Sequence, residues 1–152
     1  MSYTKNPLVL STIYDVYKLK KTASKICKSD AISIVHCRSY IAALAGLSVK
    51  EHFGARFIFD MRGFWADERV DGNLWNLKNP LYRIVYNFFK RKEIEFLTQA
   101  DQVISLTHAG SNEMNTWQNS EKFGKVSIIP CSVDTKEFNP EITVDVKKII
   151  YV

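Results

Sequence analysis

Hydrophobic and polar positions along the chain follow two different periods. Long stretches repeat apolar residues every three to four positions, as amphipathic helices do, and short runs of β-branched or aromatic residues lie between them, as buried strands do. This pattern predicts helices over residues 8–28, 39–52, 81–98 and 108–117, strands over 32–35, 57–59, 102–105, 126–130 and 148–152, and irregular structure over 60–78.

The alternation of helices with short apolar strands indicates an α/β fold, because parallel strands need helical crossovers between them. We therefore expect a Rossmann-like parallel sheet flanked by helices. Two of these helices have an apolar side that should face the core. The side predicted for the first helix carries Ile13, Val16, Tyr17, Leu19 and Ala23. The side predicted for the helix over 81–98 carries Leu81, Ile84, Val85 and Phe88.

The composition is that of an ordinary globular domain. Of the 152 residues, 46% are hydrophobic and 24% are charged, which excludes a disordered tail or a coiled coil. No run approaches the roughly 18 to 20 apolar residues of a membrane span, and no signal-peptide core follows the N-terminus. The three cysteines include no Cys-x-x-Cys pair, which favours reduced thiols, no metal site and a cytoplasmic protein.

The chain is basic, with a formal net charge of +5. Residues 1–30 hold six Lys and two Asp, and this charge spreads over predicted helical surface, which argues against a nucleic-acid-binding tail. It favours peripheral contact with an anionic membrane surface on the inner face of the membrane, or it only keeps the helices soluble. The candidate membrane contacts are Lys18, Lys20 and Lys21 in the first helix and Arg83 and Lys90 on the polar side of the helix over 81–98.

Polar and charged residues follow the first two predicted strands. Ligands of open parallel sheets bind beyond the carboxyl ends of the strands. There, carboxylates and Arg can bind sugar hydroxyls or phosphates, and an aromatic ring can pack on the apolar side of a sugar. We favour such a ligand site over the alternative, an internal ion-pair network with a buried Trp. The candidates are His36 and Arg38 after the first strand, and Asp60, Arg62, Gly63, Phe64, Trp65, Asp67, Glu68 and Arg69 after the second.

Weaker candidates follow the next two strands. Thr107 and His108 lie at a predicted helix start, where free N–H groups could bind an anion or where Thr107 could simply cap the helix. Cys131, Ser132 and Asp134 follow the fourth strand. The chain has no Gly-x-Gly-x-x-Gly, P-loop, His-Glu-x-x-His or Gly-x-Ser-x-Gly motif, which argues against dinucleotide, P-loop, zinc-hydrolase and α/β-hydrolase chemistry.

Four segments together resemble the N-terminal half of a GT-B glycosyltransferase of family 4. They are Ile34-Val-His-Cys-Arg-Ser39, Phe57-Ile-Phe-Asp-Met-Arg-Gly-Phe-Trp-Ala-Asp67, Ala100-Asp-Gln-Val-Ile-Ser105 and Ile128-Ile-Pro-Cys-Ser-Val-Asp-Thr-Lys-Glu-Phe-Asn-Pro140. The second is similar to a block in bacterial surface-polysaccharide members, and the last is similar to the family's (V/I)IPNG(V/I)D-x-x-x-F-x-P segment. Cys131 and Ser132 replace the common Asn-Gly, and Asp60-Met-Arg62 occupies a region where many members carry a His.

The resemblance implies a retaining enzyme that transfers a sugar from a nucleotide-sugar donor to a glycan or lipid-linked acceptor, with no metal or other cofactor. Residues 1–140 would form the acceptor-side domain without its first strand, and 141–152 would begin a missing C-terminal donor-binding domain. We expect such a fragment to be inactive alone. The candidates after the first two strands would then serve the acceptor, and Thr107, His108, Cys131, Ser132 and Asp134 would lie on the donor side.

Two other functions stay open at this point. A non-catalytic module that binds a glycan or an anionic lipid fits the Lys-rich first helix and the aromatic segment after the second strand. A nucleotide-sugar epimerase shares the GT-B fold but fits residues 130–140 less well. Because the first strand and the partner domain would be missing, we also expect an exposed sheet edge through which chains self-associate.

Overall fold

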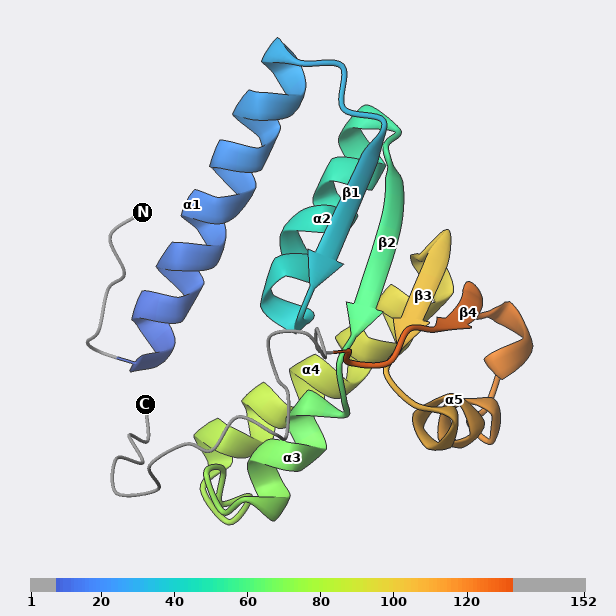
Figure 1. The fold of residues 1–152 in the computed structure, drawn as a ribbon. Coiled ribbons are helices and arrows are strands. Elements are labelled where there is room, and N and C mark those ends of the chain that lie inside the picture. The colour runs from blue at the N-terminus through green and yellow to red at the C-terminus, as the bar shows by residue number, and fades with distance from the viewer. Residues whose placement is uncertain (1–7, 133–152) are drawn as a thin grey trace, which may run out of the picture.

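The computed structural model describes residues 8–132, which follow the predicted alternation of helices and strands (Figure 1). Its elements are α1 (Leu8–Ser29), β1 (Ile34–Arg38), α2 (Tyr40–Phe53), β2 (Arg56–Met61), α3 (Trp65–Asp71), α4 (Pro80–Gln99), β3 (Gln102–Ser105), α5 (His108–Asn115), the 3₁₀ helix η1 (Ser120–Lys122) and β4 (Lys125–Ile128). Asp134, the strand expected over 148–152 and the domain expected from 141 lie outside the described residues.

The four strands form one parallel sheet in the order β1-β2-β3-β4. Cys37 pairs with Phe59, Phe59 with Val103, and Val103 with Val126. The predicted fold class, an α/β fold with a Rossmann-like parallel sheet flanked by helices, is confirmed. Because the strand order is also the chain order, every crossover moves along the sheet in the same direction.

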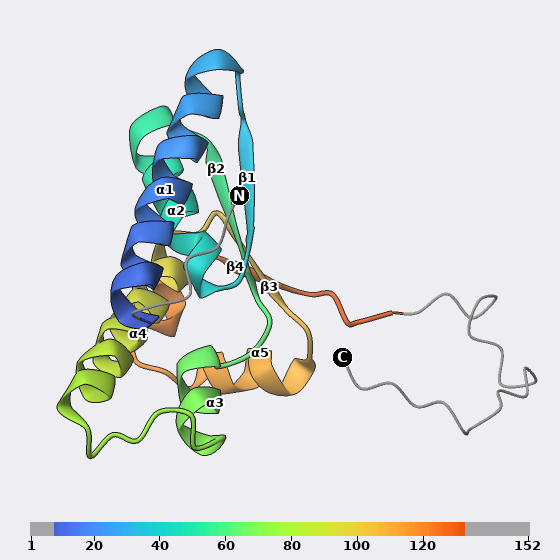
Figure 2. The same cartoon turned by 90° about the vertical axis from the view of Figure 1, so that its left-hand side faces the viewer.

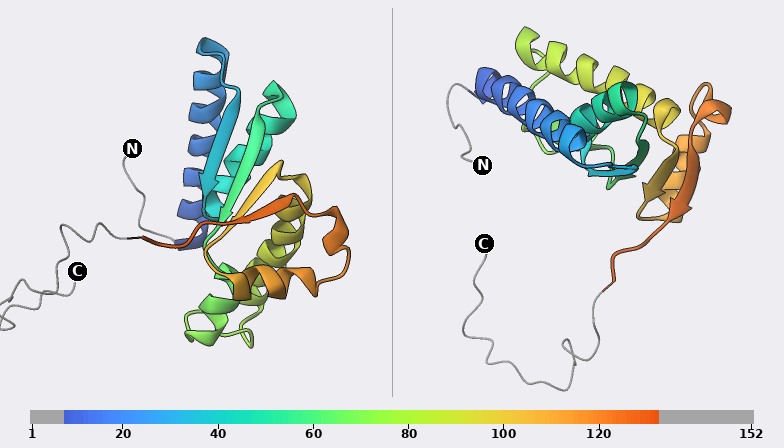
Figure 3. Two further views of the ribbon diagram at one scale, coloured as in Figure 1. Left: turned by 45° about the vertical axis from the view of Figure 1, so that its right-hand side comes forward. Right: turned by 90° about the horizontal axis from the view of Figure 1, so that it is seen from above.

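Right-handed crossovers that all move in one direction lie on one side of a sheet. Helices α1, α2 and α4 accordingly lie on the same side, and α3 and α5 lie near the carboxyl ends of the strands (Figure 2). The opposite side, which we call the open face, carries no helix within residues 8–132 (Figure 3). In β1 the side chains alternate between the two sides, so Cys37 is buried whereas His36 and Arg38 are exposed on the open face.

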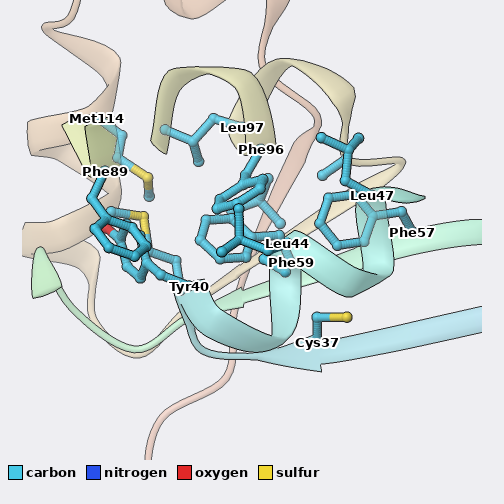
Figure 4. Close-up of a cluster of buried hydrophobic side chains, with 14 of the residues drawn as sticks. Cys37, Tyr40, Leu44, Leu47, Phe57, Phe59, Phe89, Phe96, Leu97 and Met114 are labelled. Carbon is cyan, nitrogen blue, oxygen red and sulfur yellow. The ribbon is translucent and has the colours of Figure 1, made fainter. Parts of the chain in front are cut away.

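The core lies between the sheet and helices α2 and α4 (Figure 4). Phe57 and Phe59 of β2 pack against Phe96 of α4, with ring centroids 6.3 and 5.3 Å apart. Helix α2 approaches the sheet closely at Gly46, where an added Cβ would lie 2.2 Å from Sγ of Cys37 and 3.0 Å from the Phe57 ring. Burial raises the pKa of Cys37 to about 11, so this thiol stays protonated and acts as an apolar core group.

The segment over 60–78, predicted to be irregular, contains the helix α3. Asp67 and Glu68 in its first turn favour the positive end of the helix dipole. Seven residues are too few to show a helical period in the sequence, so the pattern missed this element. The next helix begins as predicted, because the Asn79 side chain accepts a hydrogen bond from the Leu81 N–H at 2.9 Å.

The predicted core sides of α1 and α4 are wrong at several positions. Ile13 and Tyr17 are each 61% exposed, because α1 packs on α2 instead of on the sheet. In α4, Leu81, Ile84 and Phe88 are exposed, since the N-terminal half of this helix extends past the strand ends (Figure 1). Its buried side carries Phe89, Glu93, Phe96 and Leu97.

Strand β1 forms an edge of the described sheet. The hydrogen bonds of the residues that flank β1 show which of its backbone groups face β2. The Arg56 N–H donates to the Ser33 carbonyl at 2.9 Å, and the Ser39 N–H donates to the Asp60 carbonyl at 3.4 Å. Alternate residues of a strand bond to the same neighbour, so the N–H and C=O groups at positions 34, 36 and 38 point away from β2. A free edge of this kind pairs readily with another strand.

We expect two copies of the chain to associate along this edge. Ile34→Pro removes one outward N–H, and Pro is tolerated at a strand edge, so this variant should lower the dimer fraction about fivefold or more while the circular dichroism spectrum is preserved. Ile34→Ala keeps the N–H and should dimerise as the parent chain does. A wild-type monomer mass that does not depend on concentration in sedimentation equilibrium would contradict this expectation.

Candidate functional site

A hollow of about 590 Å³ lies at the carboxyl ends of β2 and β3. It is bounded by the segment after β2 on one side and by α5 on the other, and both α3 and α5 lie below the sheet in Figure 1. Six of the sequence candidates line it: Arg62, Gly63, Phe64, Asp67, Glu68 and Thr107. The rule that ligands of parallel sheets bind beyond the strand ends therefore brings together residues that are more than 40 positions apart.

One wall of the hollow is a face of α5 and the turn after it that sequence reasoning missed. Gly110, Glu113, Met114 and Trp117 line it, and the Trp117 Nε1–H donates to Oε1 of Glu113 at 3.2 Å. The sequence candidates directly follow a strand, whereas these residues lie farther along the chain, within and after α5. Their spacing of three and four positions is the signal that could have shown them as one helical face.

The opposite wall depends on the absence of a side chain at Gly63. A Cβ at this position would lie 2.1 Å from Oε1 of Glu68, so a side chain here would displace the Glu68 carboxylate from its place over the loop. Within residues 8–132, no hydrogen bond or ion pair reaches this carboxylate. The ring of Phe64 lies 5.4 Å from that of Trp117, so the hollow combines apolar ring surface with a carboxylate that has unused acceptor capacity.

A partly buried polar network, centred on the fully buried Glu93, supports this wall from behind. Lys90 of α4 donates to Oδ2 of Asp67 at 2.8 Å and also to Glu93, and Tyr86 donates to Oδ1 of Asp67 at 2.7 Å. Tyr40 of α2 donates to Glu93 and to the Gly63 carbonyl at 3.2 Å. The network thus ties α2, α3 and α4 to the loop that carries Gly63.

The charges in this network are set by burial and by the hydrogen bonds. Burial raises the pKa of the fully buried Glu93, and the hydrogen bonds from Lys90 and Tyr40 oppose that rise without cancelling it. Burial lowers the pKa of Lys90, but the bonds to Asp67 and Glu93 outweigh it, so the pKa is raised overall and the amine is charged. Burial, and next the Glu93 charge, raises the pKa of Tyr40, which keeps its proton.

Lys90 therefore does not belong to the solvated basic stripe that we predicted on α4. Its side chain is 29% exposed, and its amine also lies 4.9 Å from the Trp117 ring centroid. Arg83, the other cation predicted for that stripe, is exposed. A second hollow runs along the outside of α4, but all of its lining residues come from that one helix, so it is open helix surface.

Trp65 and Arg69 are held in an aromatic cluster outside the hollow. Trp65 stacks on Tyr40 at 5.8 Å and meets the edges of Trp75 at 5.2 Å and Phe89 at 4.8 Å, and the Arg69 guanidinium lies 5.2 Å from its ring. Both candidates thus have protein partners, as in the internal-network alternative. They fix the position of α3 against α4.

His36, Arg38 and Asp60 form a separate group on the open face. Arg38 pairs in register with Asp60, and Nε2 of His36 lies 3.3 Å from Oδ2 of Asp60. The other carboxylate oxygen, Oδ1, is buried and has no hydrogen-bond partner in the described part of the chain. A buried acceptor without a donor is unfavourable, and because protein atoms cover this oxygen, the groups of the cluster that a ligand can reach are the exposed His36 and Arg38 side chains.

The remaining candidates differ in their surroundings. Thr107 Oγ1 accepts from the Gly110 N–H at 3.0 Å, so it caps α5. His108 is exposed and does not line the hollow. Arg62 donates to Sγ of Cys131 at 3.9 Å, which brings the chain after β4 to the rim of the hollow, and Ser132 is exposed beside it.

Two further features describe the site's chemistry. Among residues 8–132, no group of three or more His, Cys, Asp or Glu side chains is placed to hold a metal ion, and Cys27, Cys37 and Cys131 are free thiols. None of the helices in this part of the chain is both long enough and apolar enough to cross a bilayer.

Comparison with known proteins gives one match. Neither the curated proteins nor the solved structures contain a match to this chain. A family model described as Glycosyltransferase Family 4 matches residues 3–137, a span that includes the whole sheet and every residue of the hollow. The chain therefore belongs to glycosyltransferase family 4.

Proposed function

We propose that this chain supplies the acceptor side of a glycosyltransferase and that the hollow beyond β2 and β3 holds the acceptor sugar. The observation that carries this proposal is that the Glu68 carboxylate, which has no partner within residues 8–132, lines one hollow together with the Phe64 and Trp117 rings. A carboxylate accepts hydrogen bonds from sugar hydroxyls, and an aromatic ring packs against the C–H side of a sugar. Arg62 at the rim adds a donor for hydroxyl or phosphate oxygens.

The reaction that we infer is transfer from a nucleotide sugar to a surface-polysaccharide or lipid-linked glycan acceptor with retention of anomeric configuration. In this reaction the nucleotide-sugar donor is held by a second domain, and residues 8–132 bind the acceptor. Positioning of both substrates is what converts such a bimolecular step into a fast one. The family assignment and the hollow support this division of labour.

The pair of His36 and Asp60 extends the proposed acceptor surface to the open face. The exposed side chains of His36 and Arg38 beside this carboxylate donate hydrogen bonds to hydroxyls of a longer acceptor. The Asp60 side chain is held in place by His36 at 3.3 Å. A second, more distant contact of this kind favours an oligosaccharide over a single sugar.

The test is ligand binding measured by saturation-transfer difference NMR, with a panel of neutral, amino and acidic mono- and oligosaccharides as probes. At least one sugar should bind with submillimolar affinity, and Glu68→Gln should weaken it about tenfold or more, because hydrogen bonds to a charged group contribute about 1.5–3 kcal/mol. Glu121→Gln, on the exposed helix η1, is the matched control and should bind as the parent chain does.

Absence of binding by every sugar in the panel would contradict the proposal, and so would an equal loss in Glu68→Gln and Glu121→Gln. A non-catalytic glycan-binding module would pass the same binding test. It is distinguished by adding the donor-binding domain of a family member and a nucleotide sugar, because only the transferase half should then support product formation.

A further inference from the structure

Helix α1 is the outermost helix of the layer that covers the sheet. It packs along α2 (Figure 1), and the side that carries Ile13, Tyr14 and Tyr17 is exposed. That side is not uniformly polar. Ile13, Tyr14 and Tyr17 are 61%, 53% and 61% exposed, so two aromatic rings and one aliphatic side chain point outward where a soluble helix usually carries charges.

The lysines of α1 lie on this same side. At about 100° per residue, all five of them fall within an arc of about 160° that also contains Ile13, Tyr14 and Tyr17. The Lys18 amine lies 5.3 Å from the Tyr14 ring centroid, so a cation and an aromatic ring already contact each other there. The five lysines are Lys18, Lys20, Lys21, Lys25 and Lys28.

The two halves of α1 carry different kinds of exposed side chain on this side. The apolar and aromatic side chains occupy the N-terminal half, and four of the five lysines follow from Lys20 onward. A helix that lies in the plane of a membrane combines such groups, because aromatic rings settle at the headgroup level and lysines attract anionic lipids. Lysines needed only for solubility would not require exposed rings beside them.

We propose that α1 docks the chain on an anionic lipid surface, with Ile13, Tyr14 and Tyr17 at the level of the headgroups and the lysines against lipid phosphates. The charge of the helix is complementary to such a surface, since α1 contains five Lys and a single Asp. Lys90 of α4 is engaged by Asp67 and Glu93, so we confine the proposal to α1. This inference does not depend on the proposed transfer reaction.

The test is co-sedimentation of the whole chain with vesicles of phosphatidylcholine alone or mixed with phosphatidylglycerol. Binding should require the anionic lipid and should fall steeply between ~50 and ~150 mM salt. Lys18→Gln/Lys20→Gln/Lys21→Gln should weaken the binding about tenfold or more. The matched control, Lys78→Gln/Lys122→Gln/Lys125→Gln, removes the same charge from exposed positions on other elements and should bind nearly as the parent chain does.

The aromatic part of the surface needs its own variant. Tyr14→Ser/Tyr17→Ser keeps every charge, and both rings are exposed, so the fold should be unaffected. It should weaken binding at ~150 mM salt, where electrostatic attraction is most screened. Equal binding to both lipid compositions, equal loss in both lysine variants, or no loss in the tyrosine variant would overturn the proposal. Binding to duplex DNA with no binding to vesicles would also overturn it.

Discussion

Lys90→Met is expected to lower the free energy of unfolding by about 3 kcal/mol. The Lys90 amine donates to Asp67 and to Glu93, whose carboxylate is fully buried. Without this amine, Tyr40 is the remaining side-chain donor to Glu93 in the described structure. Breaking a buried charged pair typically costs about 3–5 kcal/mol, and we expect the low end here because Glu93 is fully buried whereas Lys90 is 29% exposed. Urea unfolding followed by tryptophan fluorescence measures the change.

The matched control is Lys92→Met in the same helix. Lys92 also forms a pair three residues away, with Glu95 at 2.7 Å, but both side chains are partly exposed. Its loss should cost less than about 1 kcal/mol. The double variant Lys90→Met/Glu93→Gln should recover most of the stability, because a neutral amide can still accept from Tyr40. Equal losses in the two single variants would contradict the role of the polar network around Glu93.

The effect of Lys90→Met should also depend on pH. Burial already raises the pKa of Glu93, and loss of the Lys90 hydrogen bond that opposes this rise increases the pKa further. The folded variant then holds a proton that the unfolded chain has released, so stability increases as the pH falls from neutrality through the raised pKa. The difference in the free energy of unfolding between the variant and the wild type should therefore become smaller toward acid pH. A difference that stays constant would show that Glu93 is not the group responsible.

Gly46→Ala is expected to destabilise the chain by about 2 kcal/mol, although alanine is the better helix former. The new Cβ would lie 2.2 Å from Sγ of Cys37 and 3.0 Å from the Phe57 ring, so α2 must move away from the sheet. Adding Cys37→Ala removes the nearer atom and should restore about 1 kcal/mol or more, measured as the coupling in a double-mutant cycle. A single variant that is as stable as wild type would contradict the close approach.

The strands and most helices could be predicted because their signals are local. Short β-branched or aromatic runs mark β2 and β3, and Asn79 followed by Pro80 marks the start of α4. The inward sides of α1 and α4 could not be predicted, because they depend on what each helix packs against. Ile13 and Tyr17 fit a core face by spacing, but α1 packs mainly on α2 and leaves both side chains exposed.

Part of the site could be predicted, because the carboxyl ends of parallel strands meet at one edge of the sheet and bring the residues that follow them together. Arg62, Phe64 and Glu68 follow one strand and Thr107 follows the next, and the structure brings them to one hollow. Lys90 was misplaced because a lysine on a helix ordinarily faces solvent. The signal that could have corrected this is Glu93, a carboxylate on the same helical stripe as Phe89 and Phe96, where a charge needs a partner.

The measurement that decides whether the hollow is the acceptor site is NMR chemical-shift mapping during titration with the sugar that binds best. The Trp117 indole N–H and the amides of Gly63, Glu68 and Gly110 should shift together and saturate at one affinity, because all four residues line the same hollow. Signals of α1 should stay unchanged. Saturable binding that shifts α1 or the outer side of α4, and leaves these four signals in place, would contradict an acceptor site between β2 and α5.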